Sequence, residues 1–185
     1  MPQENWVDDV LSFWFEELGP ADWYAGGEEL DGRIRQRFTE LHSRLKVELD
    51  VDAIDDARTA LAAIIVFDQF PRNIYRGTAE AFSTDDMAVQ IARRALDAEF
   101  DHGLTDDEKS FLYMPFMHSE ILADQERCVD LFRALSDNEE GLKYAIEHRD
   151  IVAEYGRFPH RNKPLGREST PAEIAFLESH PGYGQ

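Results

Sequence analysis

The chain has 185 residues, enough for one domain with a sizeable hydrophobic core. Its 38 acidic and 19 basic residues give a formal net charge of −19, which argues against a general affinity for nucleic acid or for an anionic membrane. Hydrophobic residues make up 43% of the sequence and aromatic residues 11%, a composition typical of a folded protein and not of a disordered acidic chain.

The sequence indicates a reducing compartment. Cys128 is the single cysteine, so no internal disulfide can form, and its place in an apolar helical register predicts a buried, inert thiol. The first residues lack the basic and apolar regions of a signal peptide, and no apolar run reaches 18 residues. We therefore expect a soluble cytoplasmic protein with no membrane partner.

The first half of the chain predicts helices separated by short breaks. An aromatic-rich helix covers about 6–18 and ends at Gly19-Pro20. Apolar residues then recur at three- and four-residue steps over 30–49, which predicts a long amphipathic helix. After an acidic linker over 50–56, residues 60–67 are apolar on every face, as in a helix that is buried all round.

The second half predicts further helices and no strand. The first of these helices is expected to be capped by Ser83, Thr84 or Asp85. The next is opened by a capping box from Thr105 to Glu108 and is kinked or broken at Met114-Pro115. Two more helices follow over about 116–135 and 139–155, and a short last helix runs from Thr170 to Leu177. The tail from about 180 to 185 is expected to fray. The pattern predicts a single all-α domain over 1–185, with eight to nine helices in antiparallel pairs.

The buried helix leads directly into a polar motif, which reads F-D-Q-F-P-R-N-I-Y-R-G over 67–77. Pro71 is expected to stop the helix, which would place Asp68 at the negative end of the helix dipole in apolar surroundings. Because a lone carboxylate would be costly there, we expect Asp68 to be buried, ionised and paired with Arg72, Arg149 or Arg161.

A similar motif occurs near the other end, where Phe-Pro-His-Arg-Asn over 158–162 follows the pattern of Phe-Pro-Arg-Asn over 70–73. Chance similarity is the alternative to a true repeat. Segments 70–77 and 155–167 contain no acidic residue. Their candidate binding residues are Arg72, Asn73, Arg76, Arg157, His160, Arg161, Asn162 and Arg167. If the two turns converge, these side chains would form a local cationic site for a carboxylate or phosphate group; otherwise the protein's own carboxylates pair with the arginines.

Several long runs together resemble one known family. They read D-Q-F-P-R-N-I-Y-R-G-T-A (68–79), F-L-Y-M-P-F-M-H-S-E (111–120), L-A-D-Q-E-R (122–127), H-R-D-I-V (148–152), G-R-F-P-H-R-N (156–162) and L-G-R-E-S-T-P-A-E (165–173). The chain resembles domain of unknown function 924 over nearly its whole length. The resemblance implies a bacterial protein with an all-α, right-handed superhelix similar to tetratricopeptide repeats, and it carries no settled activity. Ile121 departs from the family pattern, where an acidic residue is expected.

A cluster of acidic residues and a histidine is predicted on the helix after Pro115. Glu120 and Asp124 are four residues apart and would share a face, with His118 close by. They suggest either a carboxylate pair for acid–base work or metal binding, or an ion-pair network with Arg127 and an arginine of the Phe-Pro turns. The Glu-x-x-His spacing of a di-iron bundle is missing, so we expect no metal and no cofactor.

The helix over about 139–155 carries His148, Arg149 and Asp150. Helical spacing predicts an exposed Asp150 and places Arg149 on the apolar stripe, where it would need Asp68 or Glu120 as a partner. His148 is predicted on an adjoining aromatic edge.

Two functional classes follow from these residues. The favoured one is a binding or scaffold module that recognises a small anion or an acidic peptide segment through the two Phe-Pro turns. The alternative is an enzyme acting on a small anionic metabolite, with Asp68, His118 or His148 as acid–base groups and arginines holding the substrate.

Overall fold

Helices account for all regular structure in the part of the chain that the structure describes, and no strand occurs there. The structure is a computed structural model that describes residues 5–135, 138–180 and 182–183. The all-α prediction is therefore confirmed. None of the described helices is both long enough and apolar enough to cross a membrane. Of the tail from about 180 to 185 that was expected to fray, residues 181, 184 and 185 lie outside the described residues.

The α-helices in chain order are α1 (Trp6–Ser12), α2 (Pro20–Ala25), α3 (Glu28–Glu48), α4 (Ala57–Ile64), α5 (Phe70–Ile74), α6 (Asp85–Asp97), α7 (Asp106–His118), α8 (Leu122–Ala134), α9 (Glu139–Tyr155) and α10 (Pro171–Ser179). Helical turns of the π type cover Phe13–Glu17 and Ile65–Gln69, and turns of the 3-10 type cover Val51–Ala53, Ala79–Phe82, Phe100–Gly103 and Pro159–Arg161.

Two of these helices begin with capping boxes, one of which, at Thr105, the sequence predicts. Thr105 accepts a hydrogen bond from the backbone N–H of Glu108, whose carboxylate accepts one from the backbone N–H of Thr105. Thr170 and Glu173 make the same reciprocal pair at the start of α10. Each box satisfies backbone donors that the first helical turn leaves without a partner, so both helix starts are fixed by local sequence.

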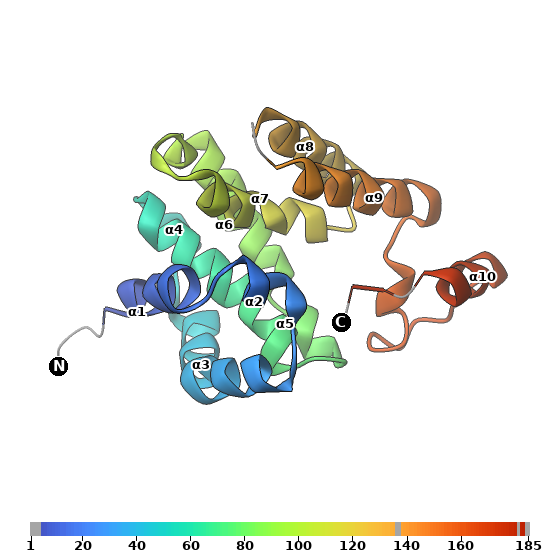
Figure 1. Cartoon of the computed structure of the whole chain (residues 1–185), viewed down its shortest axis with the longest axis horizontal. Coiled ribbons are helices and arrows are strands. Elements are labelled where there is room, and N and C mark those ends of the chain that lie inside the picture. Colours follow the sequence, from blue (N-terminus) through green and yellow to red (C-terminus); the bar gives the residue numbers. More distant parts are fainter. Residues whose placement is uncertain (1–4, 136–137, 181, 184–185) are drawn as a thin grey trace.

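The helices form an elongated molecule with α1 near one end and α10 at the other, and α8 and α9 pack side by side (Figure 1). Seven of the nine predicted core residues are buried: Trp14, Leu61, Ile64, Ile65, Phe111, Phe116 and Phe132. The other two, Leu131 and Ile146, are partly buried against the same core. A small second cluster holds Ile151, Val152 and Phe158 near α10. The single domain and the tetratricopeptide-like superhelix stay predictions.

Pro71 does not stop the buried helix, which corrects one expectation. The helical backbone runs from α4 through the π turn into α5, so Asp68 lies inside a helical run and not at its negative end. Proline has no N–H to donate to the carbonyl four residues earlier, which is that of Phe67. Thr84 supplies the missing donor, with its hydroxyl 2.7 Å from the Phe67 carbonyl oxygen. A tertiary contact therefore compensates for the proline.

Pro115 does not break its helix either. It lies inside α7, and the chain leaves the helix only after His118, through an extended linker over 119–121. The side-chain amide of Gln125 donates to the carbonyl oxygens of Met117 and Ser119, at 2.7 and 2.6 Å. Gln125 thus satisfies carbonyl groups at the end of α7 and sets the position of the break.

Candidate functional site

Asp68 is fully buried and bonded to a histidine. Its two carboxylate oxygens lie 2.7 and 2.9 Å from Nδ1 of His118, and Gln69 donates to it at 2.6 Å. Arg72 is 3.6 Å from the carboxylate, which confirms the predicted arginine pairing. Burial alone raises the pKa of Asp68, but its contact with His118, the charge of Arg72 and the hydrogen bond from Gln69 lower it further than burial raises it. Asp68 is therefore ionised.

His118 is oriented at the last position of α7 by two contacts. Nδ1 faces the Asp68 carboxylate, and the backbone carbonyl accepts a hydrogen bond from Nη2 of Arg161 at 2.8 Å. Burial, and then the charge of Arg72, lower the pKa of the imidazole, so the ring is neutral and carries its proton on Nδ1. Within the described residues Nε2 has no hydrogen-bond partner, and the side chain keeps 11% of its surface exposed.

Arg72 and Arg161, from the two Phe-Pro turns, meet at Asp85. The Arg72 guanidinium makes a bidentate pair with the Asp85 carboxylate at 2.8 and 3.0 Å, and Nη1 of Arg161 lies 3.3 Å from it. Both guanidinium groups also lie over the ring of Phe82. The predicted convergence of the two turns therefore holds for their arginines.

The asparagines of the two turns do not line that meeting point. Asn73 donates to Asp31, which also pairs with Arg76. Asn162 donates to Glu173, which pairs with Arg157. Each asparagine thus shares a carboxylate with an arginine of its own turn, so these pairs tie the turn to a neighbouring helix.

Glu120 and Asp124 do not form the predicted carboxylate pair, because the linker after α7 separates them. Glu120 pairs with Arg167 at 2.8 and 2.9 Å and accepts a hydrogen bond from the backbone N–H of Phe158. Asp124, in the first turn of α8, pairs with Arg93 instead. Both residues are therefore in ion pairs, Glu120 with an arginine of the second Phe-Pro segment and Asp124 with Arg93 in place of the expected Arg127.

The inward face of α9 is rotated by about one residue from the predicted stripe. Arg149 points outward and pairs with the exposed Asp150 at 2.6 Å, so neither Asp68 nor Glu120 is its partner. His148 is buried instead, and its Nδ1–H donates to the carbonyl oxygen of Tyr144 at 2.7 Å. Burial, and then nearby His118, lower the pKa of His148 to about 3. Its ring centre lies 6.4 Å from that of His118.

The remaining predicted histidine, His160, lies outside this group. Its Nε2 is 2.9 Å from Nδ1 of His180, and the other nitrogen of His180 is 2.7 Å from Glu147. No group of three or more metal-ligating side chains occurs over the described ranges. Cys128 is buried, and burial raises the pKa of its thiol, as expected for an inert cysteine.

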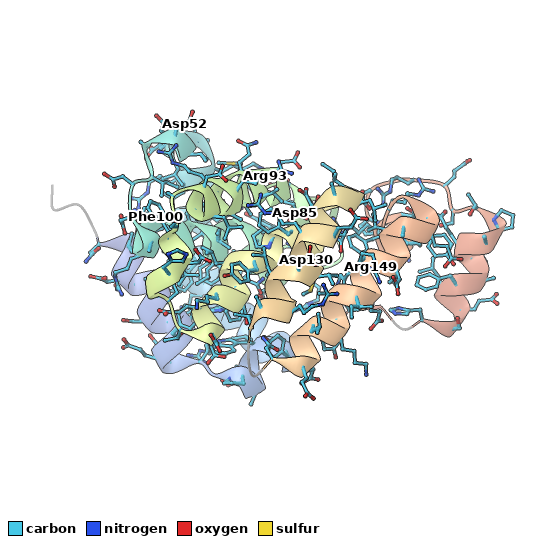
Figure 2. All side chains as sticks on the ribbon, turned by 90° about the horizontal axis from the view of Figure 1, so that it is seen from above. Asp52, Asp85, Arg93, Phe100, Asp130 and Arg149 are labelled. Atoms are coloured by element: carbon cyan, nitrogen blue, oxygen red, sulfur yellow. The ribbon has the colours of Figure 1, made fainter. Side chains whose placement is uncertain are left out.

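The structure therefore assembles a compact cluster, which we call the dyad site, from Asp68, Arg72, Asp85, His118, His148 and Arg161. Nε of Arg72 and Nε of Arg161 are buried there without a hydrogen-bond partner among the described residues. Unsatisfied buried polar atoms are uncommon and often accompany function. Two surface hollows lie away from this cluster. The lining of one includes Asp52 and Arg93, which Figure 2 labels, and the lining of the other includes Phe13.

The sequence alone did not identify three residues in or beside the dyad site. Asp85 was considered as a helix cap, but Thr84 takes the cap position and Asp85 turns toward the arginines. Gln69 lies next to Asp68 in the polar motif, which was a usable signal. Tyr183, which stacks on His148, falls in the tail that we expected to fray.

Two comparisons show proteins that are similar to this chain. The family model described as a bacterial protein of unknown function (DUF924) matches residues 10–181. A solved structure of a protein of unknown function from Agrobacterium tumefaciens is similar, with 37% sequence identity and a TM-score of 0.84, covering 94% of this chain and 97% of that one. None of the curated proteins matches.

Proposed function

The chain belongs to the DUF924 family of bacterial proteins of unknown function, and within that family we propose that it is an enzyme in which His118 acts as a general base. The observation that carries the proposal is the hydrogen-bonded Asp68–His118 pair, whose second imidazole nitrogen is open. The substrate class is a small anionic metabolite. The buried free Cys128 supports a cytoplasmic location.

The Asp68–His118 pair has the chemistry of a base and its orienting carboxylate. An ionised Asp68 can only accept, so the imidazole proton stays on Nδ1 and the lone pair stays on Nε2. Because burial keeps the ring neutral, Nε2 is ready to take a proton near neutral pH.

His148 adds a second acceptor to the site. Its Nδ1–H is held by the Tyr144 carbonyl, so its lone pair is also on Nε2. With ring centres 6.4 Å apart, His118 and His148 could both approach one small nucleophile between them. In the proposed step a water molecule or substrate hydroxyl gives its proton to Nε2 of His118. The oxygen of that water molecule or hydroxyl then bonds to an acyl or phosphoryl centre of the substrate. The bond to the leaving group breaks, and the leaving group departs with the proton from His118.

The arginines supply the positive charge for an anionic substrate. Arg72 and Arg161 flank His118, and fixed cations beside a reacting centre stabilise the charge that develops in the transition state. Ser119 is not the nucleophile, because its hydroxyl donates to Asp124 at 2.7 Å. The nucleophile is therefore a water molecule or part of the substrate.

Recognition of a small anion or acidic peptide without chemistry is the second candidate. The convergence of Arg72 and Arg161 favours it, but Asp85 already neutralises part of that charge, and Arg76, Arg157 and Arg167 have carboxylate partners of their own. A binding module also gives no reason for the open imidazole of His118. We therefore favour the enzyme.

Turnover of a panel of small carboxylate-bearing and phosphate-bearing esters tests the proposal. Wild-type protein is expected to hydrolyse or transfer at least one, and His118→Gln should lower kcat/KM by about 100- to 10,000-fold. His102→Gln is the matched control, because His102 is exposed on the Phe100–Gly103 turn. A His118→Gln variant that keeps wild-type turnover would overturn the proposal. Thermal shifts by the same compounds with no turnover would favour the binding module.

A further inference from the structure

The chain after α10 folds back over α9 and covers one wall of the dyad site. The ring of Tyr183 stacks on His148 with ring centres 4.1 Å apart and planes 20° from parallel. Its hydroxyl donates to Glu147 at 3.1 Å, one residue before His148. The described residues after α10 thus lie between α10 and the body of the molecule (Figure 1).

Two histidines anchor the same segment. His180 lies 2.7 Å from Glu147 through Nε2 and 2.9 Å from His160 through Nδ1. Glu147 therefore accepts from both His180 and Tyr183, so one carboxylate on α9 holds two points of the segment. A side chain on Gly182 would lie 3.2 Å from the His160 ring, and the glycine has a φ of +79°, so the close return of the chain needs glycine there.

The attachment is apolar but small. Tyr183 packs on the second hydrophobic cluster, whose buried members are Ile151, Val152 and Phe158, and not on the main core. Segments with few buried apolar contacts open at much lower free energy than the core of a protein. The contacts of Tyr183 are therefore of the kind that a lid uses.

We propose that His180 and Tyr183 form a lid over the dyad site, with Tyr183 as the gate in front of His148. The inference rests on the proposed function for its purpose, since the lid would admit the substrate and then exclude water. The rest of the dyad site has little exposed surface, since the side chains of Arg72, Asp85 and His118 are each 11% exposed.

Chemical access to the imidazoles tests the lid without any substrate. Diethyl pyrocarbonate acylates neutral imidazole nitrogens, and peptide mass spectrometry reports the rate at each histidine. Tyr183→Ala removes the stacked ring, so modification of His148 should become about three- to tenfold faster, as expected for the loss of one aromatic pair. His118 should follow in the same direction. The exposed His102 should keep its wild-type rate.

Two further variants keep the test decisive. Tyr24→Ala removes an exposed tyrosine on α2 and should leave every histidine rate unchanged. His180→Gln weakens the anchor to Glu147 and should accelerate His148 without removing the Tyr183 ring. A Tyr183→Ala protein with unaltered thermal stability and a wild-type rate at His148 would overturn the lid. If the protein proves not to be an enzyme, the test of the lid still holds, because the assay measures chemical access to the histidines and not turnover.

Discussion

Arg72 and Arg161 are separated by nearly half of the chain, yet both bind the same carboxylate, that of Asp85. Two buried guanidinium groups close together repel each other, and burial together with the charge of Arg72 contributes to lowering the pKa of Arg161 to about 10. Asp85 offsets this repulsion, so it joins the α5 turn to the turn before α10. The dyad site depends on this joint.

Replacing Asp85 should therefore be costly. Asp85→Asn removes the charge that neutralises two buried arginines, and breaking a buried pair in this way typically destabilises a protein by about 3–5 kcal/mol. Urea unfolding measures the change. Asp86→Asn is the matched control, because Asp86 is the next residue on α6 and is exposed. Equal stability of the two variants would contradict the claim that Asp85 joins the two turns.

Buried neutral histidines should make the protein less stable in mild acid. Burial lowers the pKa of His42 to about 4 and of His148 to about 3, below the value of about 6.5 for an unfolded histidine. As pH falls below 6.5 the unfolded chain gains protons that the folded chain cannot take, so stability decreases. Each histidine should contribute a loss of about 2 kcal/mol between pH 7 and pH 5.

The contribution of one histidine can be isolated with His42→Gln. His42 lies far from the proposed chemistry in sequence and contacts Thr84 and Tyr75. The variant should lose less stability than the wild type between pH 7 and pH 5, measured by urea unfolding at both pH values. A wild-type pH dependence in the variant would mean that His42 is protonated in the folded protein. Asp68 has no part in this window, because its folded pKa is lowered and its contribution fades only in stronger acid.

The fold could be predicted from sequence where the structure of a helix depends only on the residues within it. The apolar run over 60–67, the capping box at Thr105 and the start at Thr170 correctly indicated a buried helix and two helix starts. Local reasoning failed at Pro71, because Thr84, which compensates for that proline, comes from another part of the chain. It also failed at Pro115, where the helix continues to His118. The direction of Arg149 was missed because a rotation of one residue along α9 exchanges it with His148.

The candidate site was predicted in part. Asp68 carried a clear signal, since a carboxylate directly after eight apolar residues needs partners. The identity of its closest partner depended on where α7 ends, which Gln125 decides from the next helix. Asp85 could not be ranked above the other acids, because nothing local distinguishes it from Asp86.

Loss of the Glu120 charge should loosen the end of the chain selectively. Glu120→Gln weakens the bidentate pair with Arg167, which also donates to the Phe158 carbonyl. Because both side chains are about a quarter exposed, the cost should be modest, about 1–2 kcal/mol. Hydrogen exchange should accelerate over 158–173 and stay unchanged in α4. Glu126→Gln, on the exposed face of α8, should change neither region.

The hydroxyl of Thr84 should be worth more than that of an ordinary helical threonine. Thr84→Val keeps the shape of the side chain but leaves the Phe67 carbonyl without the donor that Pro71 cannot provide. An unpaired buried carbonyl costs about 1–3 kcal/mol. Thr39→Val is the control, since the Thr39 hydroxyl donates to the Arg35 carbonyl on the exposed part of α3 and water can replace it.

A double-mutant cycle with Pro71→Ala tests the reason for that cost. Alanine restores a backbone N–H at position 71, which can donate to Phe67 if the π turn relaxes toward regular helix. Thr84→Val should then be less destabilising in the Pro71→Ala background than in the wild type, giving a coupling of about 0.5–2 kcal/mol between the two positions. Urea unfolding of the four proteins measures it. Additive effects would mean that Thr84 stabilises the helix for a reason unrelated to the proline.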